Sequence, residues 1–159
     1  MPAAKKTSRS AAAPRLADFL CFTVYSANLA YGRAYKPILA KLGLTYTQYI
    51  AIVALWEEDH QTVRGLGEKL FLESNTLTPI LKKLEEMGYL RRQRDPQDER
   101  QVVVSLTEAG RLLREKGLTM TLVKESGLPP EEFAKLQKAV AALRNNLLKA
   151  AKSQDGDSD

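Results

Sequence analysis

The chain has 159 residues, of which 44% are hydrophobic, and its 24 basic and 19 acidic side chains give a formal net charge of +5. This length is typical of one globular domain with a sizeable core; the single cysteine excludes a disulfide framework, and no apolar run is long enough to span a bilayer. A single histidine, and the lack of a phosphate-binding glycine loop or a nucleophile elbow, argue against a zinc site and an ordinary enzyme, so we expect no metal and no cofactor.

The N-terminal residues 1–14 are basic and poor in large apolar groups. Lys5, Lys6 and Arg9 stand among alanines and serines, a composition typical of a disordered tail. The tail lacks the hydrophobic segment of a secretory signal. Together with the single cysteine, this indicates a cytoplasmic protein in a reducing setting.

A long amphipathic helix is expected next. Apolar side chains recur at helical spacing from Leu16 to Leu42. Pro37 is expected to kink or break this helix near its end, and Gly43 to stop it. Cys21 lies early in the helix. A lone cysteine at such a position is most often a small buried apolar residue, and the alternative, a reactive thiol, depends on its surroundings.

Two shorter helices are expected to follow. Thr45 and Gln48 have the three-residue spacing of a capping box, which opens a helix that continues through Trp56. The next helix is expected from Val63 to Leu70, and a tight polar turn comes after it. This pair of elements leads directly into the helix that carries the functional prediction.

The helix expected from about Ser74 to Met87 has the pattern of a DNA-recognition helix. One face is an apolar packing stripe, and the other carries hydroxyl and amide groups that suit base edges, followed by lysines that suit phosphates. Its candidate DNA-binding residues are Ser74, Asn75, Thr76, Thr78 and Lys82. An ordinary capped surface helix is the alternative. Pro79 predicts a late start, near Asn75 or Thr76, because proline is tolerated only in the first turn.

A charged hairpin is expected after this helix. Leu90 to Gln93 and Gln101 to Leu106 have the composition of strands. Arginines at a hairpin tip, steadied by carboxylates, suit a narrow minor groove; a solvated hairpin with incidental charges is the alternative. The candidate wing residues are Arg94, Asp98 and Arg100. Helix, turn, helix and hairpin together predict a winged helix-turn-helix over residues 61–106 that binds double-stranded DNA.

Two helices are expected after the hairpin. Thr107 caps one that runs from Glu108 to about Val123, and Pro129 and Pro130 open the last one. The terminal helices hold more apolar surface than a small winged helix needs, which predicts a helical dimerisation platform.

The expected architecture is therefore mainly α-helical with a small β-wing. A single domain is expected over residues 15–152, with dimerisation helices at 15–44 and 107–152 and a disordered acidic tail at 153–159. A symmetric homodimer would place two recognition helices about one DNA turn apart, which matches a palindromic operator.

The chain also resembles a known family, the MarR-type winged-helix repressors, and in particular the organic hydroperoxide resistance regulators. The resemblance is carried by LCFTVYSANLAYGRAYKPILAKLGLTYTQYIAIVALWE and by LGEKLFLESNTLTPILKKLEEMGYLRRQRDPQDERQVVVSLTEAG. It covers about Arg15 to Glu115. Four features match that branch in the same order along the chain: the cysteine, the spaced tyrosines, the recognition helix and the Asp-x-Arg wing.

This resemblance implies a redox sensor. In that branch an N-terminal cysteine senses organic peroxides and two tyrosines hydrogen-bond its sulfur; by position these are Cys21, Tyr35 and Tyr46. The nearby sensor pocket would comprise Phe19, Phe22 and Tyr25. Fourteen residues separate Cys21 from Tyr35, so on one straight helix they lie about 21 Å apart. Tyr35 could therefore support only the thiol of the partner subunit. Dimer packing is the alternative for the tyrosines.

One position departs from the two-cysteine subgroup of that branch. Its resolving cysteine falls in the region where this chain has Lys124 to Gly127, and the near-isosteric Ser126 stands there. The chain either belongs to the one-cysteine subgroup, which uses a low-molecular-weight thiol, or carries Ser126 as a replacement. As written, it cannot form a disulfide between two different cysteines.

The expected function is a repressor. The reduced homodimer would bind its operator and be released when an organic hydroperoxide, the inducer, oxidises Cys21 to a sulfenic acid. Two alternatives stay open: a related regulator that binds a small molecule and has a structural Cys21, and a thiol peroxidase. The missing second cysteine argues against the peroxidase.

Overall fold

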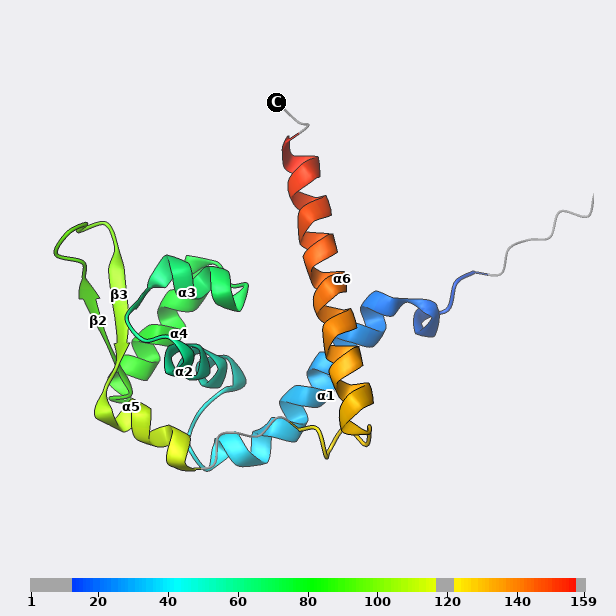
Figure 1. Ribbon diagram of the computed structural model, residues 1–159, viewed down its shortest axis with the longest axis horizontal. Coiled ribbons are helices and arrows are strands. Elements are labelled where there is room, and N and C mark those ends of the chain that lie inside the picture. The colour runs from blue at the N-terminus through cyan, green and yellow to red at the C-terminus, as the bar shows by residue number, and fades with distance from the viewer. Residues whose placement is uncertain (1–12, 117–121, 157–159) are drawn as a thin grey trace, which may run out of the picture. The chain divides into compact units, whose positions relative to one another are not determined.

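The computed structural model describes residues 13–116 and 122–156 (Figure 1). These residues fall into two compact units, which divide between residues 113 and 114. The elements in chain order are η1 (Leu16–Asp18), α1 (Leu20–Ala40), α2 (Tyr46–Glu57), β1 (Gln61–Thr62), α3 (Val63–Leu70), α4 (Ser74–Glu86), β2 (Leu90–Arg94), β3 (Val102–Leu106), α5 (Glu108–Leu112), η2 (Leu113–Lys116) and α6 (Pro130–Gly156). The predicted fold class, mainly helical with a small β-wing, is confirmed.

The helix α1 begins later than predicted and ends at Ala40, two residues before the predicted end at Leu42. The first residues of the expected helix form a separate 3-10 turn, η1. Pro37 does not end the helix, which continues to Ala40. Gly43 then adopts φ +67°, and the N–H of Leu44 donates to the carbonyl of Leu39 over 3.0 Å. This is a Schellman ending, and its left-handed residue at position 43 favours glycine, which has no Cβ.

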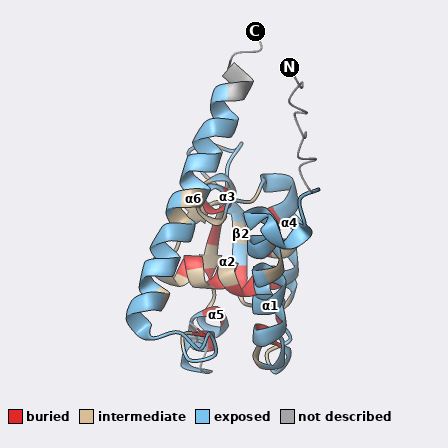
Figure 2. Cartoon of the chain, turned by 90° about the vertical axis from the view of Figure 1, so that its right-hand side faces the viewer, coloured by how far each residue is buried: buried red, intermediate tan, exposed pale blue. Residues whose placement is uncertain are grey.

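The helix α2 forms the centre of the first unit. The predicted capping box is confirmed: the N–H of Gln48 donates to the Thr45 hydroxyl and the N–H of Thr45 donates to the Gln48 side chain. Figure 2 shows most of α2 as buried or half-buried. Ile52 and Leu55 are fully covered, and burying each such side chain stabilises the fold by about 1.5–3 kcal/mol.

The helix-turn-helix consists of α3 and α4. The predicted bounds of α3 are confirmed. The prediction that α4 starts late is wrong, because it begins at Ser74 and Pro79 lies in its second turn. The missing N–H of Pro79 would have paired with the carbonyl of Asn75, which is exposed, so water can satisfy that carbonyl. Burial of Leu77 and Leu81 on the opposite face stabilises the early start.

The wing is a three-stranded antiparallel sheet in the order β1-β3-β2. The strands β2 and β3 agree with the predicted strands to within one residue, and Leu90 pairs with Leu106. The third strand, β1, was not predicted. It has only two residues, Gln61 and Thr62, which pair with Val104 and Val103. An alternating pattern cannot be recognised over two residues.

The segment after the wing differs from its prediction. Thr107 caps α5 as expected, accepting the N–H of Gly110. A continuous helix to Val123 is wrong, since α5 ends at Leu112 and the 3-10 turn η2 follows. Residues 117–121 lie outside the described residues. Leu122 has φ +52°, a left-handed conformation that a right-handed helix cannot contain.

The second unit is dominated by α6, which begins at Pro130 as predicted. The helix continues through residues 153–156, which were expected in the acidic tail, because helix-forming alanines and Lys152 precede them and no proline intervenes. Residues 1–12 and 157–159 of the expected tails lie outside the described residues. None of the described helices is long and apolar enough to cross a membrane.

Candidate functional site

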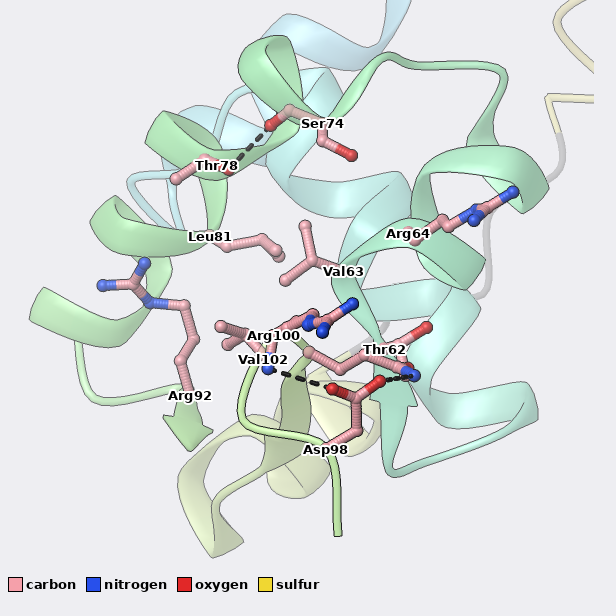
Figure 3. A pocket seen from close by; sticks show the side chains of 11 residues that line it. Thr62, Val63, Arg64, Ser74, Thr78, Leu81, Arg92, Asp98, Arg100 and Val102 are labelled. Carbon is pink, nitrogen blue, oxygen red and sulfur yellow. Dashed lines mark hydrogen bonds between the residues drawn. The ribbon is translucent and has the colours of Figure 1, made fainter. Parts of the chain in front are cut away.

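A groove of about 600 Å³ lies between α3, α4 and the wing (Figure 3). Its walls carry three arginines, several hydroxyl groups and one carboxylate. The lining residues are Thr62, Val63, Arg64, Ser74, Thr78, Leu81, Arg92, Asp98, Arg100, Gln101 and Val102. A cationic groove rimmed by short polar side chains has the chemistry to bind phosphates and base edges.

The predicted recognition residues of α4 are all exposed. Ser74 and Thr78 line the groove, and the Thr78 hydroxyl donates to the Ser74 carbonyl over 2.6 Å. Asn75, Thr76 and Lys82 do not line it. The structure therefore brings two of the five predicted residues together with the wing and leaves the others on the open surface of the same helix.

The wing tip is held in shape by Asp98. Its carboxylate accepts the N–H of Arg100 over 3.2 Å and the side-chain amide of Gln101 over 3.0 Å. The Arg100 side chain reaches into the groove between Thr62 and Val102 (Figure 3). Arg94 ends β2 and is exposed outside the groove. Asp98 thus orders the turn from which Arg100 projects.

A carboxylate that the sequence reasoning missed ties α4 to the wing. Glu85 accepts the N–H, Nε and Nη2 of Arg92 over 2.9, 2.9 and 2.8 Å. The amide and guanidinium of Arg92 hold the pKa of Glu85 below its ordinary value. Glu85 and Arg92 are seven residues apart in the sequence, and the end of α4 lies between them, so no regular spacing predicts that they meet. The groove-lining Arg64 was missed too, although its ion pair with Glu68 has ordinary i,i+4 spacing.

A second missed carboxylate, Asp59, joins the wing to α5. It accepts the N–H of Leu106 over 2.9 Å and the guanidinium of Arg111 over 3.0 Å. Burial would raise the pKa of Asp59, but these bonds and the N–H of His60 outweigh it and lower the pKa. Asp59 is therefore ionised at neutral pH and fixes the end of β3.

The predicted sensor residue, Cys21, is exposed on α1. Phe22 lies beside it and packs against Tyr25, with ring centroids 6.4 Å apart. Phe19 and Tyr25 are 43% and 59% exposed. Within one chain, the expected sensor pocket is thus an open apolar surface around a thiol.

The predicted thiolate-supporting tyrosines lie together, away from Cys21 along the chain. The rings of Tyr35 and Tyr46 are 5.2 Å apart, and Tyr49 packs against both. Burial, and secondarily Tyr31, raise the pKa of Tyr46. A phenol with a raised pKa keeps its proton and remains a hydrogen-bond donor. The Tyr46 hydroxyl is therefore protonated at neutral pH and can act as a hydrogen-bond donor.

Ser126, the position suggested for a resolving cysteine, lies in an exposed turn of the second unit. Its hydroxyl donates to the carbonyl of Val123 over 2.6 Å and accepts the N–H of Leu128 over 3.2 Å. The serine therefore has a turn-forming role of its own. Among the described residues, no cluster of histidine, cysteine and carboxylate side chains suits a metal ion.

Comparison with known proteins places the chain in a family. Residues 33–116 match the family of transcriptional regulators SarA/Rot. The organic hydroperoxide resistance transcriptional regulator of Bacillus subtilis is 43% identical, over 84% of this chain and 92% of its own length. The chain is a MarR-type regulator of the organic hydroperoxide resistance branch. These relatives are regulators, so the chain is a transcriptional regulator and not an enzyme such as the thiol peroxidase considered above.

A second relative agrees in sequence, and a solved structure agrees in sequence and in fold. The regulator TtmR of Methylorubrum extorquens is 46% identical, over 80% of this chain and 67% of its own. The solved structure of reduced AbfR bound to DNA is 36% identical, with a TM-score of 0.71, over 85% of this chain and 94% of that chain. The winged helix-turn-helix architecture expected of this MarR-type chain is thereby confirmed.

Proposed function

We propose that the chain is a redox-sensing repressor that acts in the cytoplasm. Its reduced homodimer binds a palindromic operator, and oxidation of Cys21 by an organic hydroperoxide releases the DNA. The observation that carries this proposal is the position of Cys21: an exposed thiol on an apolar stretch of the helix that also bears Tyr35. The Bacillus subtilis relative is a regulator of organic hydroperoxide resistance.

The DNA-binding part rests on the groove and its two walls. Ser74 and Thr78 on α4 would enter the major groove, and Arg100 on the wing would enter the neighbouring minor groove. AbfR has been solved bound to DNA in its reduced and overoxidised forms. Because residues of α4 and of the wing line the same groove of the protein, a single DNA duplex can contact α4 and the wing together.

The homodimer is supported by apolar surface on both units. On α1, Leu20 and Leu29 are 61% and 44% exposed, and on α6, Leu136 and Leu147 are 52% and 61% exposed. Exposed apolar stripes on long helices are costly in water and typical of interfaces. A second copy of the chain, using residues 15–44 and 107–152, would cover them.

The sensing chemistry starts from the Cys21 thiolate. Tyr35 and Tyr46 of the partner subunit donate hydrogen bonds to the sulfur, which favours the thiolate. The thiolate attacks one peroxide oxygen, so that an S–O bond forms, the O–O bond breaks, and the leaving alkoxide takes a proton from water to become an alcohol. Condensation of the sulfenic acid with a low-molecular-weight thiol releases water and gives a mixed disulfide. The apolar side chains of Phe19 and Phe22 favour organic peroxides over hydrogen peroxide.

The test begins with the DNA and the oligomer. Reduced protein is used to select duplexes from a random library, and the enriched sequences are expected to contain an inverted repeat. Sedimentation should give a dimer, and Leu147→Glu should weaken it while Lys149→Glu, on the same exposed helix, should not. Enrichment of no sequence, or a monomer that still binds an inverted repeat tightly, would contradict the proposal.

A further inference from the structure

The contact between Glu85 and Arg92 joins the recognition helix to the wing at one point. Glu85 lies in the last turn of α4 and Arg92 in the middle of β2. Their side chains are 35% and 24% exposed, so the pair is partly shielded from solvent. The backbone N–H of Arg92 donates to one oxygen of Glu85, and its Nε and Nη2 converge on the other, so both carboxylate oxygens are held by charge-assisted bonds. The pair therefore constrains orientation, not only distance.

The same carboxylate also covers an open sheet edge. β2 is an edge strand. Thr107 donates its N–H to Tyr89 and Asp95 donates its N–H to Gln101, so residues 89 and 95 bond toward β3. By alternation, the N–H of Arg92 points away from β3. Glu85 accepts this outward N–H over 2.9 Å. One side chain thus caps the edge and holds the arginine beside it.

This pairing determines what Arg92 can do in the groove. Its Nε and Nη2 both donate to one oxygen of Glu85, so much of its charge is neutralised before DNA arrives. Arg100, at the other end of the hairpin, has no ion pair among the described residues. The chain link between α4 and β2 is a short turn at Gly88, with φ +80°. A turn alone would leave the hairpin angle less constrained.

We infer that Glu85 is a positioning residue: it fixes the wing against the recognition helix so that both contact one operator together. The inference rests on the proposed DNA binding and adds a determinant of specificity to it. A wing ordered in advance loses less conformational freedom on binding. A wing released from Glu85 would still carry its arginines, and these would still bind phosphates. The affinity for the operator would fall, whereas the affinity for non-specific DNA would not.

The test exploits the sign of the charge change. Glu85→Gln removes a negative charge beside the groove, so simple electrostatics predicts tighter binding to any DNA. Positioning predicts the reverse for the operator: roughly five- to tenfold weaker specific binding, with non-specific binding unchanged or tighter. Glu86→Gln, which removes the neighbouring exposed carboxylate paired with Lys83, is the matched control and should leave the specificity ratio within about twofold.

A double-mutant cycle with Arg100→Ala provides the second readout. If Glu85 positions the wing, the loss caused by Arg100→Ala should shrink in the Glu85→Gln background. Hydrogen exchange should also rise at the β2 amides of Glu85→Gln without DNA present. Arg92→Lys keeps the charge and the outward N–H. It should show a smaller coupling to Arg100→Ala and a smaller rise in hydrogen exchange, and it replaces Glu85→Gln in both experiments if that variant does not fold.

The outcomes separate the two claims. Equal or higher specificity of Glu85→Gln, or additive losses in the cycle, would overturn the positioning role while leaving operator binding intact. A reduced wild-type chain that discriminates no sequence would overturn the proposed function, and with it the role of Glu85 in specificity. If hydrogen exchange at the β2 amides is the same in Glu85→Gln as in the wild type, Glu85 does not hold the wing, whatever the DNA-binding results are.

Discussion

Cys21 and Tyr35 lie on one uninterrupted helix, fourteen residues apart, which places them about 21 Å from each other. Tyr35 instead packs against Tyr46, with ring centroids 5.2 Å apart. The two phenols are thus assembled as a pair at one end of α1, and the thiol is exposed near the other. Any support that the tyrosines give to a thiol must come from a second subunit.

This separation predicts complementation between two defective chains. A chain with Tyr35→Phe and Tyr46→Phe should react slowly with cumene hydroperoxide, and a Cys21→Ser chain should not react. In their mixed dimer, one site combines Cys21 of the first chain with both tyrosines of the second. Its thiol should therefore be oxidised at the wild-type rate, as measured by thiol loss after rapid mixing.

The control for this experiment is the unmixed double-phenylalanine dimer. If the mixed dimer reacts no faster than that control, the tyrosines do not act across the interface. Tyr31→Phe is a second control, a conservative change on the exposed part of α1. Tyr31 contributes only secondarily to the raised pKa of Tyr46, so this variant should oxidise within about twofold of the wild-type rate.

Arg100→Ala should weaken operator binding by about 1–3 kcal/mol and reduce the salt dependence by about one unit of slope, because one cation leaves the groove. Arg91→Ala is the matched control, since strand alternation turns Arg91 to the opposite face of β2 from the groove-lining Arg92. The measurement is fluorescence anisotropy over a series of salt concentrations. Equal losses for the two variants would show that general charge, not wing placement, governs binding.

Gly110→Ala should destabilise the fold by about 2–4 kcal/mol. A Cβ at this position would lie 2.0 Å from the Tyr89 carbonyl oxygen and 3.1 Å from a Leu106 methyl group, so α5 would have to move away from the wing. Ala109→Ser, at the exposed neighbouring position, should cost less than about 0.5 kcal/mol. Urea unfolding of both variants checks this, and similar midpoints would mean that α5 is not held closely there.

Asp59→Asn should lower stability at neutral pH by about 1–3 kcal/mol, because the carboxylate binds two backbone amides and Arg111. The pKa of Asp59 is lowered in the folded state, so its stabilisation is full above the ordinary carboxyl pKa and is lost as pH falls through the lowered value. The difference from wild type should therefore shrink in acid. Urea midpoints measured from pH 7 down to pH 3 test this; a difference that grows in acid would contradict it.

Local chemistry made much of the fold predictable. The capping box of Thr45 and Gln48, the Schellman glycine at position 43 and the helix-opening Pro130 each act within a few residues, so their spacing can be recognised in one sequence. The exposed face of α4 was predicted for the same reason. Pro79 misled the prediction because burial on the other face of α4 outweighed a local cost.

The parts that were missed depend on contacts between distant segments. β1 forms because β3 offers it an edge, and Glu85 meets Arg92 because the turn at Gly88 folds β2 back along α4. Asp59 and Arg111 are far apart in sequence and meet only in the folded unit. No periodicity encodes such pairs, although they fix the wing on which the candidate site depends.

The most direct test of the sensor is an operator titration with three proteins: the reduced chain, the same chain after treatment with cumene hydroperoxide, and Cys21→Ser after the same treatment. The reduced chain should bind the selected inverted repeat, treatment should weaken that binding at least about tenfold, and Cys21→Ser should bind equally well with and without treatment. If treatment leaves binding by the unmodified chain unchanged, or weakens Cys21→Ser as much, Cys21 is not the switch.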